Sequence, residues 1–169
     1  EKLITQRISG GLKPLVTSYD NYKYYTFNST NTILSRNKLY DLKYILALLY
    51  SNLINWYYVS KFTNKSNLTV NISKTFLEKI PIKKVSIEQQ KPFIERVNIL
   101  IENYKRFYEL KDKFIELIKY KYNIDKTSRK LYTFYKLSFK EFVTEIKSQG
   151  MSIEKESELM DFFEKNKKE

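Results

Sequence analysis

Amide, guanidinium and hydroxyl side chains are concentrated, together with lysines, in the first 70 residues of the chain. Such side chains form directional hydrogen bonds with the edges of nucleic-acid bases, and cations beside them neutralise phosphate groups. The pattern therefore predicts a surface that contacts DNA. The candidate DNA-binding residues are Gln6, Arg7, Lys13, Thr17, Tyr19, Asn21, Tyr22, Lys23, Arg36, Asn37, Lys61, Lys65 and Asn67, and Asn28, Asn31 and Asn64 lie in the same polar segments.

Arg7 is the first candidate for contact with a base or a phosphate. It is one of two arginines among residues 1–85, and it alternates with apolar neighbours on a predicted strand. The alternative interpretation is an exposed strand arginine without a special role. For the lysines, phosphate contact and simple solubility both stay open, because an ammonium group is a point charge that carries little sequence information.

Four tyrosines follow one another closely in this region, namely Tyr19, Tyr22, Tyr24 and Tyr25. Aromatic rings stack on unpaired or extruded bases. Alternating aromatic residues in strands also fill a core or form cross-strand pairs. Both interpretations stay open at this point.

The net charge of +12 is distributed unevenly along the chain. Residues 1–85 carry 13 basic and 4 acidic side chains, a net charge of +9, whereas residues 86–169 carry 18 and 15, a net charge of +3. A basic surplus of this size favours polyanionic partners. The second half has the mixed-sign pattern of solvated helix faces.

Catalysis by this chain is not expected. It contains no cysteine and no histidine, which removes thiol nucleophiles, imidazole bases and the usual zinc ligands. A glycine-rich cofactor loop, a P-loop and the Asn/Asp-Pro-Pro-Tyr motif of amino-methyltransferases are also missing from the sequence. We therefore expect no catalytic, cofactor-binding or metal-binding residue here.

Hydrophobic periodicity predicts a small sheet with packed helices in the first half. Alternation over Leu3–Ser9 indicates a strand with Leu3, Thr5 and Arg7 on one face. The other candidate strands are Leu15–Tyr19, Tyr22–Phe27, Thr32–Leu34 and Leu68–Ile72. A helix capped by Asp41 follows, with a break near Ser51-Asn52, and its expected apolar face is Leu42, Ile45, Leu46, Leu49, Leu53 and Trp56. Ser73–Lys79 is predicted as a short helix before an extended Ile80–Ile82.

The second half is predicted to be helical. A long helix from about Gln89 to Lys121 follows a Ser86–Gln89 capping box, with Pro92 suited to its first turn. Its apolar stripe is Ile87, Ile94, Val97, Ile101, Tyr104, Tyr108, Ile115, Ile118 and Tyr122. A capping box at Ser138 and Glu141, with Leu137 and Phe142 as a hydrophobic staple, indicates a further helix that stops at Gly150, and a last helix starts from Ser152.

Four stretches carry a resemblance to a known family. They are KLITQRIS at Lys2–Ser9, TSYDNYKYYTFN at Thr17–Asn28, YILALLYSNLINWYY at Tyr44–Tyr58 and FLEKIPIKKVSIEQQKPFIERV at Phe76–Val97. In their order and spacing, over roughly residues 2–122, the chain resembles the TaqI-like C-terminal specificity domain, the DNA-reading end of single-chain type II restriction-modification enzymes. Specificity subunits of type I restriction systems are more distantly similar.

The resemblance implies an α+β target-recognition domain with a small mixed or antiparallel sheet at residues 1–85. A long helix at 86–122 would pack on it, and a helical appendage at 123–169 would follow. It further implies sequence-specific recognition of double-stranded DNA by a non-catalytic fragment. The partner would be the methyltransferase portion of the same parent chain, a DNA (adenine-N6) methyltransferase with or without endonuclease activity. S-adenosylmethionine, and possibly Mg²⁺, would then bind elsewhere in the parent.

The chain begins at Glu1 without an initiator methionine, so we expect an excised C-terminal fragment. No run of about 18 charge-free apolar residues appears, which favours a soluble, cytoplasmic protein without a membrane partner. The resemblance to restriction-modification enzymes further implies a bacterial or archaeal protein. The alternative function is a helical module that binds a partner protein or an anionic membrane through its long helix. The near-balanced charge of residues 86–169 argues against the membrane variant.

Overall fold

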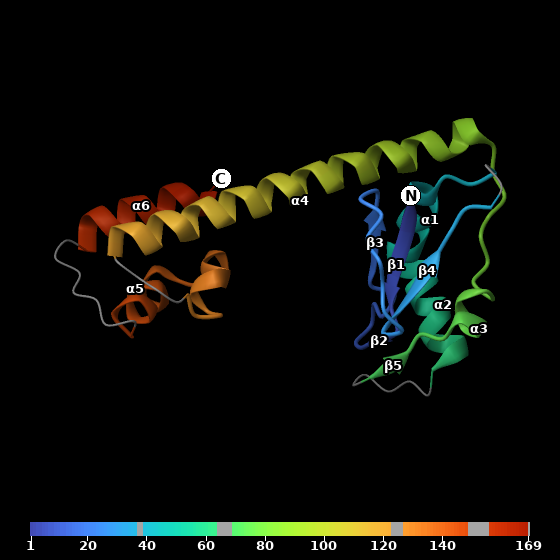
Figure 1. Cartoon of the computed structure of the whole chain (residues 1–169), viewed down its shortest axis with the longest axis horizontal. Coiled ribbons are helices and arrows are strands. Elements are labelled where there is room, and N and C mark those ends of the chain that lie inside the picture. The colour runs from blue at the N-terminus through green and yellow to red at the C-terminus, as the bar shows by residue number, and fades with distance from the viewer. Residues whose placement is uncertain (37–38, 64–68, 123–126, 149–155, 169) are drawn as a thin grey trace. The chain divides into compact units, whose positions relative to one another are not determined.

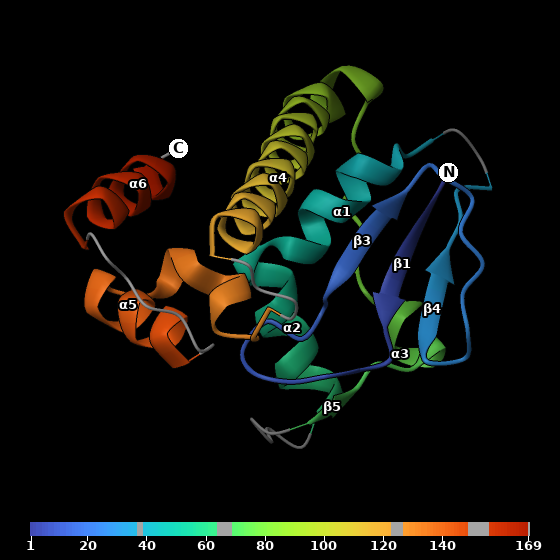
Figure 2. The ribbon, with the colours of Figure 1, turned by 60° about the vertical axis from the view of Figure 1, so that its left-hand side comes forward.

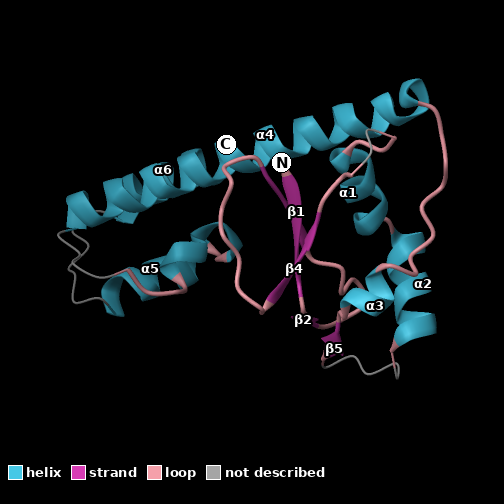
Figure 3. Ribbon diagram, turned by 45° about the vertical axis from the view of Figure 1, so that its right-hand side comes forward, coloured by secondary structure: helices cyan, strands magenta, loops and turns pink. Residues whose placement is uncertain are grey.

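The structure, a computed structural model, describes residues 1–36, 39–63, 69–122, 127–148 and 156–168. The chain folds as two compact units, Glu1–Ile101 and Glu102–Glu169, and each is treated separately below. Small antiparallel sheets and several helices make up the first unit, and the described elements of the second are helical (Figures 1 and 3). The predicted α+β class is confirmed.

A three-stranded antiparallel sheet forms the centre of the first unit. Strand β1 (Lys2–Gln6) lies between β3 (Thr17–Asp20) and β4 (Thr30–Ile33), as Figure 2 shows. A second sheet of two short strands pairs β2 (Ile8–Ser9) with β5 (Val70–Asn71), and Ile8 stands opposite Asn71. Chain segments about 60 residues apart thereby meet beside the end of β1.

The alternation predicted for the first strand holds up to Gln6. Leu3 and Thr5 are both fully buried, and the Thr5 hydroxyl lies 3.0 Å from that of Thr17 on β3. Exposed Gln6 points to the other face of the sheet. Continued alternation would bury Arg7 on the face of Leu3 and Thr5, yet Arg7 is exposed because the strand is interrupted there.

Helices α1 (Leu42–Tyr50) and α2 (Asn52–Phe62) meet at the predicted break. Asp41 caps α1 by accepting a hydrogen bond from Lys43 N, and Ser51 caps α2 by accepting one from Ile54 N. Both the cap and the break are confirmed. Leu42, Leu46 and Leu49 of α1 are buried, and the helix contacts β1 and β3.

The apolar face predicted to continue into α2 is wrong. Leu53 and Trp56 are 69% and 65% exposed, whereas Ile54, Asn55 and Tyr58 are buried. The extended backbone of Ser51 restarts the helical phase, so the residues that face the core shift by one position. Periodicity carried across a helix break therefore selects the wrong face.

Residues 22–27 do not form the predicted strand. They are an exposed loop between β3 and β4, and Lys23 has a positive φ of 61°. The carboxylate of Asp20 accepts hydrogen bonds from Tyr22 N at 2.8 Å and Tyr24 N at 3.0 Å, so it satisfies these two amides in place of a neighbouring strand. The tyrosines of this segment accordingly have no cross-strand partner in the β3-β1-β4 sheet.

Helix α4 (Ile87–Tyr122) contributes to both units. It begins with the predicted capping box, in which Ser86 N donates to Gln89 Oε1 at 3.0 Å and Gln89 N donates to Ser86 Oγ at 3.3 Å. Pro92 lies inside the helix rather than at its start. Buried Gln90 accepts from Asp41 N and donates to Leu39 O, both at 2.9 Å, which fixes the first turns against the cap of α1.

The predicted short helix is confirmed as α3 (Lys74–Leu77). The core of the first unit is built by β1, α1, α2 and the segments around α3. Its buried members are Leu3, Leu15, Leu42, Leu46, Leu49, Ile54, Tyr58, Val70, Ile72, Ile80 and Val97. Val97 belongs to α4, so the first turns of that helix complete this core.

The second unit packs the last turns of α4 with the 3₁₀ helix η1 (Leu131–Lys136), α5 (Phe139–Ser148) and α6 (Glu156–Lys168). Its core is largely aromatic, and the ring centroids of Phe114 and Phe134 are 3.8 Å apart. The capping box at Ser138 and Glu141 is confirmed by bonds in both directions. The predicted stop at Gly150 and the start at Ser152 lie outside the described residues.

The predicted stripe of α4 is buried only near its two ends. Val97 lies in the core of the first unit, and Ile115 and Ile118 lie in that of the second. Between them, Tyr104 and Tyr108 are 62% and 52% exposed. The long helix thus contributes its two ends to two separate cores.

Candidate nucleic-acid interface

Arg7 occupies the junction between the two sheets of the first unit. Its backbone N–H donates to Ser29 O at 3.0 Å, and its carbonyl accepts from Ile72 N at 2.7 Å. One guanidinium N–H donates to Asn28 O at 2.8 Å. The residue is therefore held from both sides, while a guanidinium group carries five N–H donors and this side-chain bond uses one of them.

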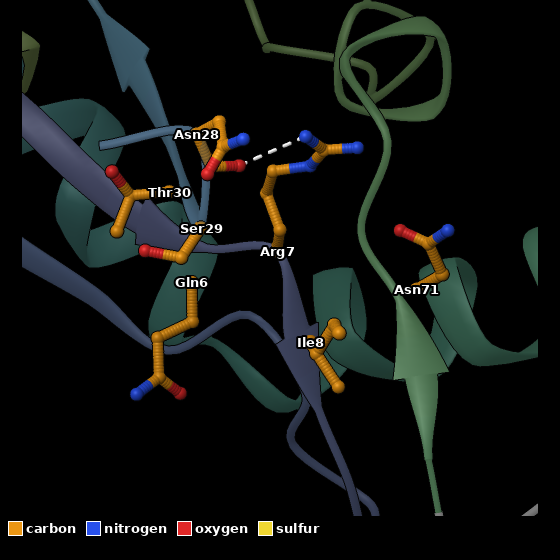
Figure 4. A pocket seen from close by; sticks show the side chains of 7 residues that line it. All are labelled: Gln6, Arg7, Ile8, Asn28, Ser29, Thr30 and Asn71. Carbon is orange, nitrogen blue, oxygen red and sulfur yellow. Dashed lines mark hydrogen bonds between the residues drawn. The ribbon is translucent and has the colours of Figure 1, made fainter. Parts of the chain in front are cut away.

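A surface hollow of about 550 Å³ surrounds Arg7 (Figure 4). Its lining residues are Gln6, Arg7, Ile8, Asn28, Ser29, Thr30 and Asn71. In Figure 4, Arg7 lies between Asn28 and Asn71, which come from different segments of the chain. Six of the seven are polar or charged residues, so hydrogen-bonding groups from several segments of the chain border the hollow. The hollow fits a partner that is itself rich in hydrogen-bonding groups.

The chemistry of this lining matches that of base edges. Arginine forms paired hydrogen bonds with guanine O6 and N7, and asparagine or glutamine forms them with adenine N6 and N7. Arg7, Gln6, Asn28 and Asn71 supply both kinds of group within one hollow. Hydroxyl groups of Ser29 and Thr30 lie beside them and can bond either bases or phosphates.

Of the ten candidate DNA-binding residues that the structure describes, Gln6 and Arg7 line the hollow, together with Asn28 from the same polar set. Ile8, Ser29, Thr30 and Asn71 were not anticipated. Ile8 and Thr30 have no signal that marks them in the sequence. Asn71 arrives through the pairing of β2 with β5, which no local period encodes.

Thr17 and Tyr19 lie on β3 and face the protein more than the solvent. Thr17 is 3% exposed, and its hydroxyl donates to Leu15 O at 3.2 Å and lies beside that of Thr5. Half-buried Tyr19 packs against the core, and Lys43 Nζ lies 4.9 Å from its ring centroid. Burial raises the pKa of its hydroxyl, and a hydrogen bond with Glu1 raises it further. Neither side chain presents its polar group freely to a ligand here.

The other described candidates are exposed and distributed over the first unit. Asn21, Tyr22 and Lys23 lie on the loop between β3 and β4. Lys13 follows β2, Arg36 follows β4, and Lys61 lies in the last turn of α2. Asn37, Lys65 and Asn67 lie outside the described residues.

Acidic side chains are scarce over the first 77 residues of this unit. Residues 1–77 contain only Glu1, Asp20 and Asp41. Asp20 is 3% exposed and lies 3.4 Å from Lys2 Nζ, and Asp41 Oδ1 caps α1. The exposed cations therefore face little opposing charge, which favours attraction of a polyanion.

Asp20 is the electrostatic anchor of the loop that follows it. Burial raises the pKa of its carboxyl, but the hydrogen bonds from Tyr22 N, Lys2 and Tyr24 N outweigh burial and leave the pKa below its ordinary value of 3.8. The ionised form is thus the one that the fold stabilises. This contribution is fully present above pH 3.8 and is lost as the pH falls through the lower pKa of the folded state.

We therefore expect Asp20→Asn to lower the thermal midpoint of the protein at neutral pH and to lower it less at acidic pH. The amide can accept only part of the hydrogen bonds and carries no charge toward Lys2. Differential scanning calorimetry of both proteins from about pH 6 to about pH 3 measures the difference. A difference that stays constant over this range would show that the ionisation of Asp20 does not support the loop.

Two family models match the chain, and together they cover nearly all of it. Residues 1–82 match the TaqI-like C-terminal specificity domain, and residues 86–169 match a domain of unknown function, DUF8810. The first match confirms the resemblance to that specificity domain, a class that points to target recognition in restriction-modification enzymes. The match ends at residue 82, whereas the resemblance in the sequence predicts that the similarity extends to about residue 122. No curated protein and no solved structure matches the chain.

Two further observations concern the described residues alone. They contain no group of three or more His, Cys, Asp or Glu side chains placed to hold a metal ion. None of their helices combines the length and the apolar character that a membrane crossing requires.

Proposed function

We propose that the first unit recognises a specific sequence in double-stranded DNA and confers target choice on a restriction-modification enzyme, without catalysis of its own. The observation that carries this proposal is the polar hollow around Arg7. It lies in a unit that matches a specificity domain over residues 1–82 and that carries 15 basic against 6 acidic side chains. Cations at its surface would bind phosphate, and the hollow would accept base edges.

The catalytic partner in this proposal is a DNA (adenine-N6) methyltransferase portion of the same parent chain. S-adenosylmethionine, and Mg²⁺ if the parent cleaves DNA, would bind there and not to this chain. The protein would work in the cytoplasm. The family match supports the placement of catalysis outside this chain, because a specificity domain is generally not catalytic by itself.

Binding of duplex DNA should weaken steeply as salt rises. If the exposed cations Lys13, Lys23, Arg36 and Lys61 each neutralise one phosphate, log K should fall against log salt with a slope of about −3.6, at about −0.9 per phosphate. Fluorescence anisotropy of a labelled random-sequence duplex with the 169-residue chain measures this slope. Absence of binding even at low salt would refute the proposal.

A matched pair of variants tests where the binding cations lie. Lys13→Gln with Lys61→Gln should lower the affinity and flatten the slope by about 2. Lys105→Gln with Lys113→Gln removes the same charge from exposed positions of the second unit and should change neither. Equal losses in the two double variants would show that net charge, and not the first unit, governs binding.

A second candidate function is a helical module that binds a partner protein. It is favoured by the exposed apolar side chains in the middle of α4, where Ile99 and Leu100 are 59% and 55% exposed and Tyr104 and Tyr108 are also exposed. A module of this kind would not bind DNA. If its target were an anionic membrane instead of a protein, the chain would sediment with anionic liposomes. The near-balanced charge of residues 86–169 gives DNA no comparable attraction there.

A further inference from the structure

The loop between β3 and β4 exposes four aromatic side chains within six residues. Tyr22, Tyr24, Tyr25 and Phe27 are 70%, 63%, 102% and 87% exposed. We call residues 21–27 the aromatic loop. Contiguous exposed aromatic surface of this kind usually marks a binding site, and a phenylalanine in particular has no polar group that would explain its exposure.

The aromatic loop is fixed at both ends by hydrogen bonds of its own backbone. Asp20 holds the amides of Tyr22 and Tyr24 at its start. At its end, Phe27 O accepts from Thr30 N at 3.1 Å and from Thr30 Oγ1 at 3.0 Å. The rings are therefore presented by an ordered turn, and a ligand that contacts them has less loop entropy to overcome.

Charge distinguishes the partner that these rings fit. Residues 21–40 contain no acidic side chain, and the neighbouring Asp20 is buried against Lys2. Lys23 lies in the middle of the loop. Exposed aromatic rings among unopposed cations are typical of surfaces that stack on bases while cations follow the phosphate backbone. An apolar protein partner would require no such charge.

The aromatic loop is continuous with the hollow around Arg7. The Arg7 guanidinium donates to the carbonyl of Asn28, the residue directly after Phe27 (Figure 4). Asn28 itself lines the hollow. A duplex whose base edges met Arg7 would therefore bring a neighbouring base step to the rings of the aromatic loop.

We propose that the aromatic loop stacks on a base that has left the stack of the bound duplex, with Tyr25 and Phe27 as the stacking side chains. These two rings are the most exposed of the four. The inference rests on the proposed function, because it requires the first unit to bind DNA. It assigns the loop to an unpaired or unstacked base, whereas the hollow takes the edges of paired bases.

The test compares three labelled DNAs in anisotropy titrations of the 169-residue chain, namely an intact duplex, the same duplex with one bulged base, and its single strand. We expect the bulged duplex to bind about tenfold more tightly than the intact one, as a single base stack allows. Tyr25→Ala and Phe27→Ala should each abolish this preference and change the affinity for the intact duplex less than about threefold. The fluorescence of a 2-aminopurine placed at the bulge should be quenched by the unsubstituted protein and not by the variants.

Trp56→Ala is the matched control, because Trp56 is an aromatic residue of the same unit and is 65% exposed on α2. It should keep the preference for the bulge. Tyr25→Trp should keep it as well, since a larger ring still stacks. Thermal unfolding of each variant shows that the fold is retained.

The outcomes separate the inference from the proposed function. If the unsubstituted 169-residue chain binds none of the three DNAs, the proposed function fails and the inference fails with it. If the unsubstituted chain binds the intact duplex without preference for the bulge, the inference is overturned and DNA recognition stands. The same conclusion follows if the loop variants bind all three DNAs as the unsubstituted chain does. Either of these two results would indicate that the aromatic loop contacts a partner protein instead of DNA.

Discussion

Arg7→Ala should lower the affinity for the preferred DNA site by about 10- to 100-fold and leave the affinity for unrelated duplexes nearly unchanged. A paired arginine–guanine contact contributes about 1–3 kcal/mol of discrimination against the wrong base. Arg7 is held by Ser29, Ile72 and Asn28 in the hollow, so its guanidinium points at one place and is not free to follow the phosphate backbone. The preferred site would first be selected from a randomised duplex pool.

Arg7→Lys distinguishes a base contact from a phosphate contact. Lysine keeps the positive charge but loses the planar fork that pairs with guanine. A base contact predicts that Arg7→Lys binds the preferred site almost as poorly as Arg7→Ala. Recovery of affinity in Arg7→Lys, with equal losses of Arg7→Ala on all sequences and a salt slope reduced by about 1, would assign Arg7 to phosphate instead.

The fold of Arg7→Ala must be intact for this reading. The side chain is exposed and donates one hydrogen bond to Asn28 O, so the loss of this bond should lower the thermal midpoint by only a few degrees. Lys13→Ala is a suitable companion, because Lys13 is exposed in the same unit but does not line the hollow. Its effect should be small and equal for all sequences.

Local signals predicted the helices well because each of them is encoded by neighbouring residues. Asp41 caps α1, Ser51 separates α1 from α2, and the Ser86–Gln89 box starts α4. A capping residue and its partner lie within three positions, so their interaction does not depend on the rest of the fold. Periodicity was wrong beyond the helix break, because the apolar stripe of α1 does not continue through Ser51 to Leu53 and Trp56, which are exposed.

The candidate site was predicted only in part because long-range pairing creates it. Arg7 and Gln6 could be selected from residue type and position on a strand, but their neighbour Asn71 depends on β2 pairing with β5. Strands of two residues carry too little periodicity to encode such a pairing. Thr17 shows the opposite case, since a polar residue on a strand was selected for DNA and is in fact buried beside Thr5.

The strand predicted at Tyr22–Phe27 was wrong for a different physical reason. Alternating tyrosines over Tyr22–Phe27 have high strand propensity, yet Asp20 satisfies two of the amides that a strand would pair. Aspartate hydrogen-bonds its own backbone a few residues on and tolerates turns, so this competition between side chain and sheet is general. The Asp20-Asn21 pair was the available signal.

Asn55→Leu should destabilise the first unit by about 2–4 kcal/mol, since each buried polar group left without a partner costs about 1–3 kcal/mol. Asn55 is 2% exposed. Its Oδ1 accepts from Leu15 N at 3.2 Å, and its Nδ2 donates to Leu49 O at 2.7 Å and to Ser51 O at 3.0 Å. It thereby joins the segment before β3 to the break between α1 and α2.

Urea unfolding followed by the fluorescence of Trp56 measures this loss, because Trp56 is the only tryptophan and lies in the same helix. Asn52→Leu is the matched control: it makes the same change at an exposed position of α2 and should shift stability by less than about 0.5 kcal/mol. Asn55→Asp keeps an acceptor for Leu15 N but loses both donors, so it should also be destabilising. If Asn55→Leu unfolds at the same urea concentration as Asn52→Leu, the three bonds of Asn55 do not hold the helix break in place. The route by which α1 and α2 support β1 and Arg7 would then have to be sought in apolar packing alone.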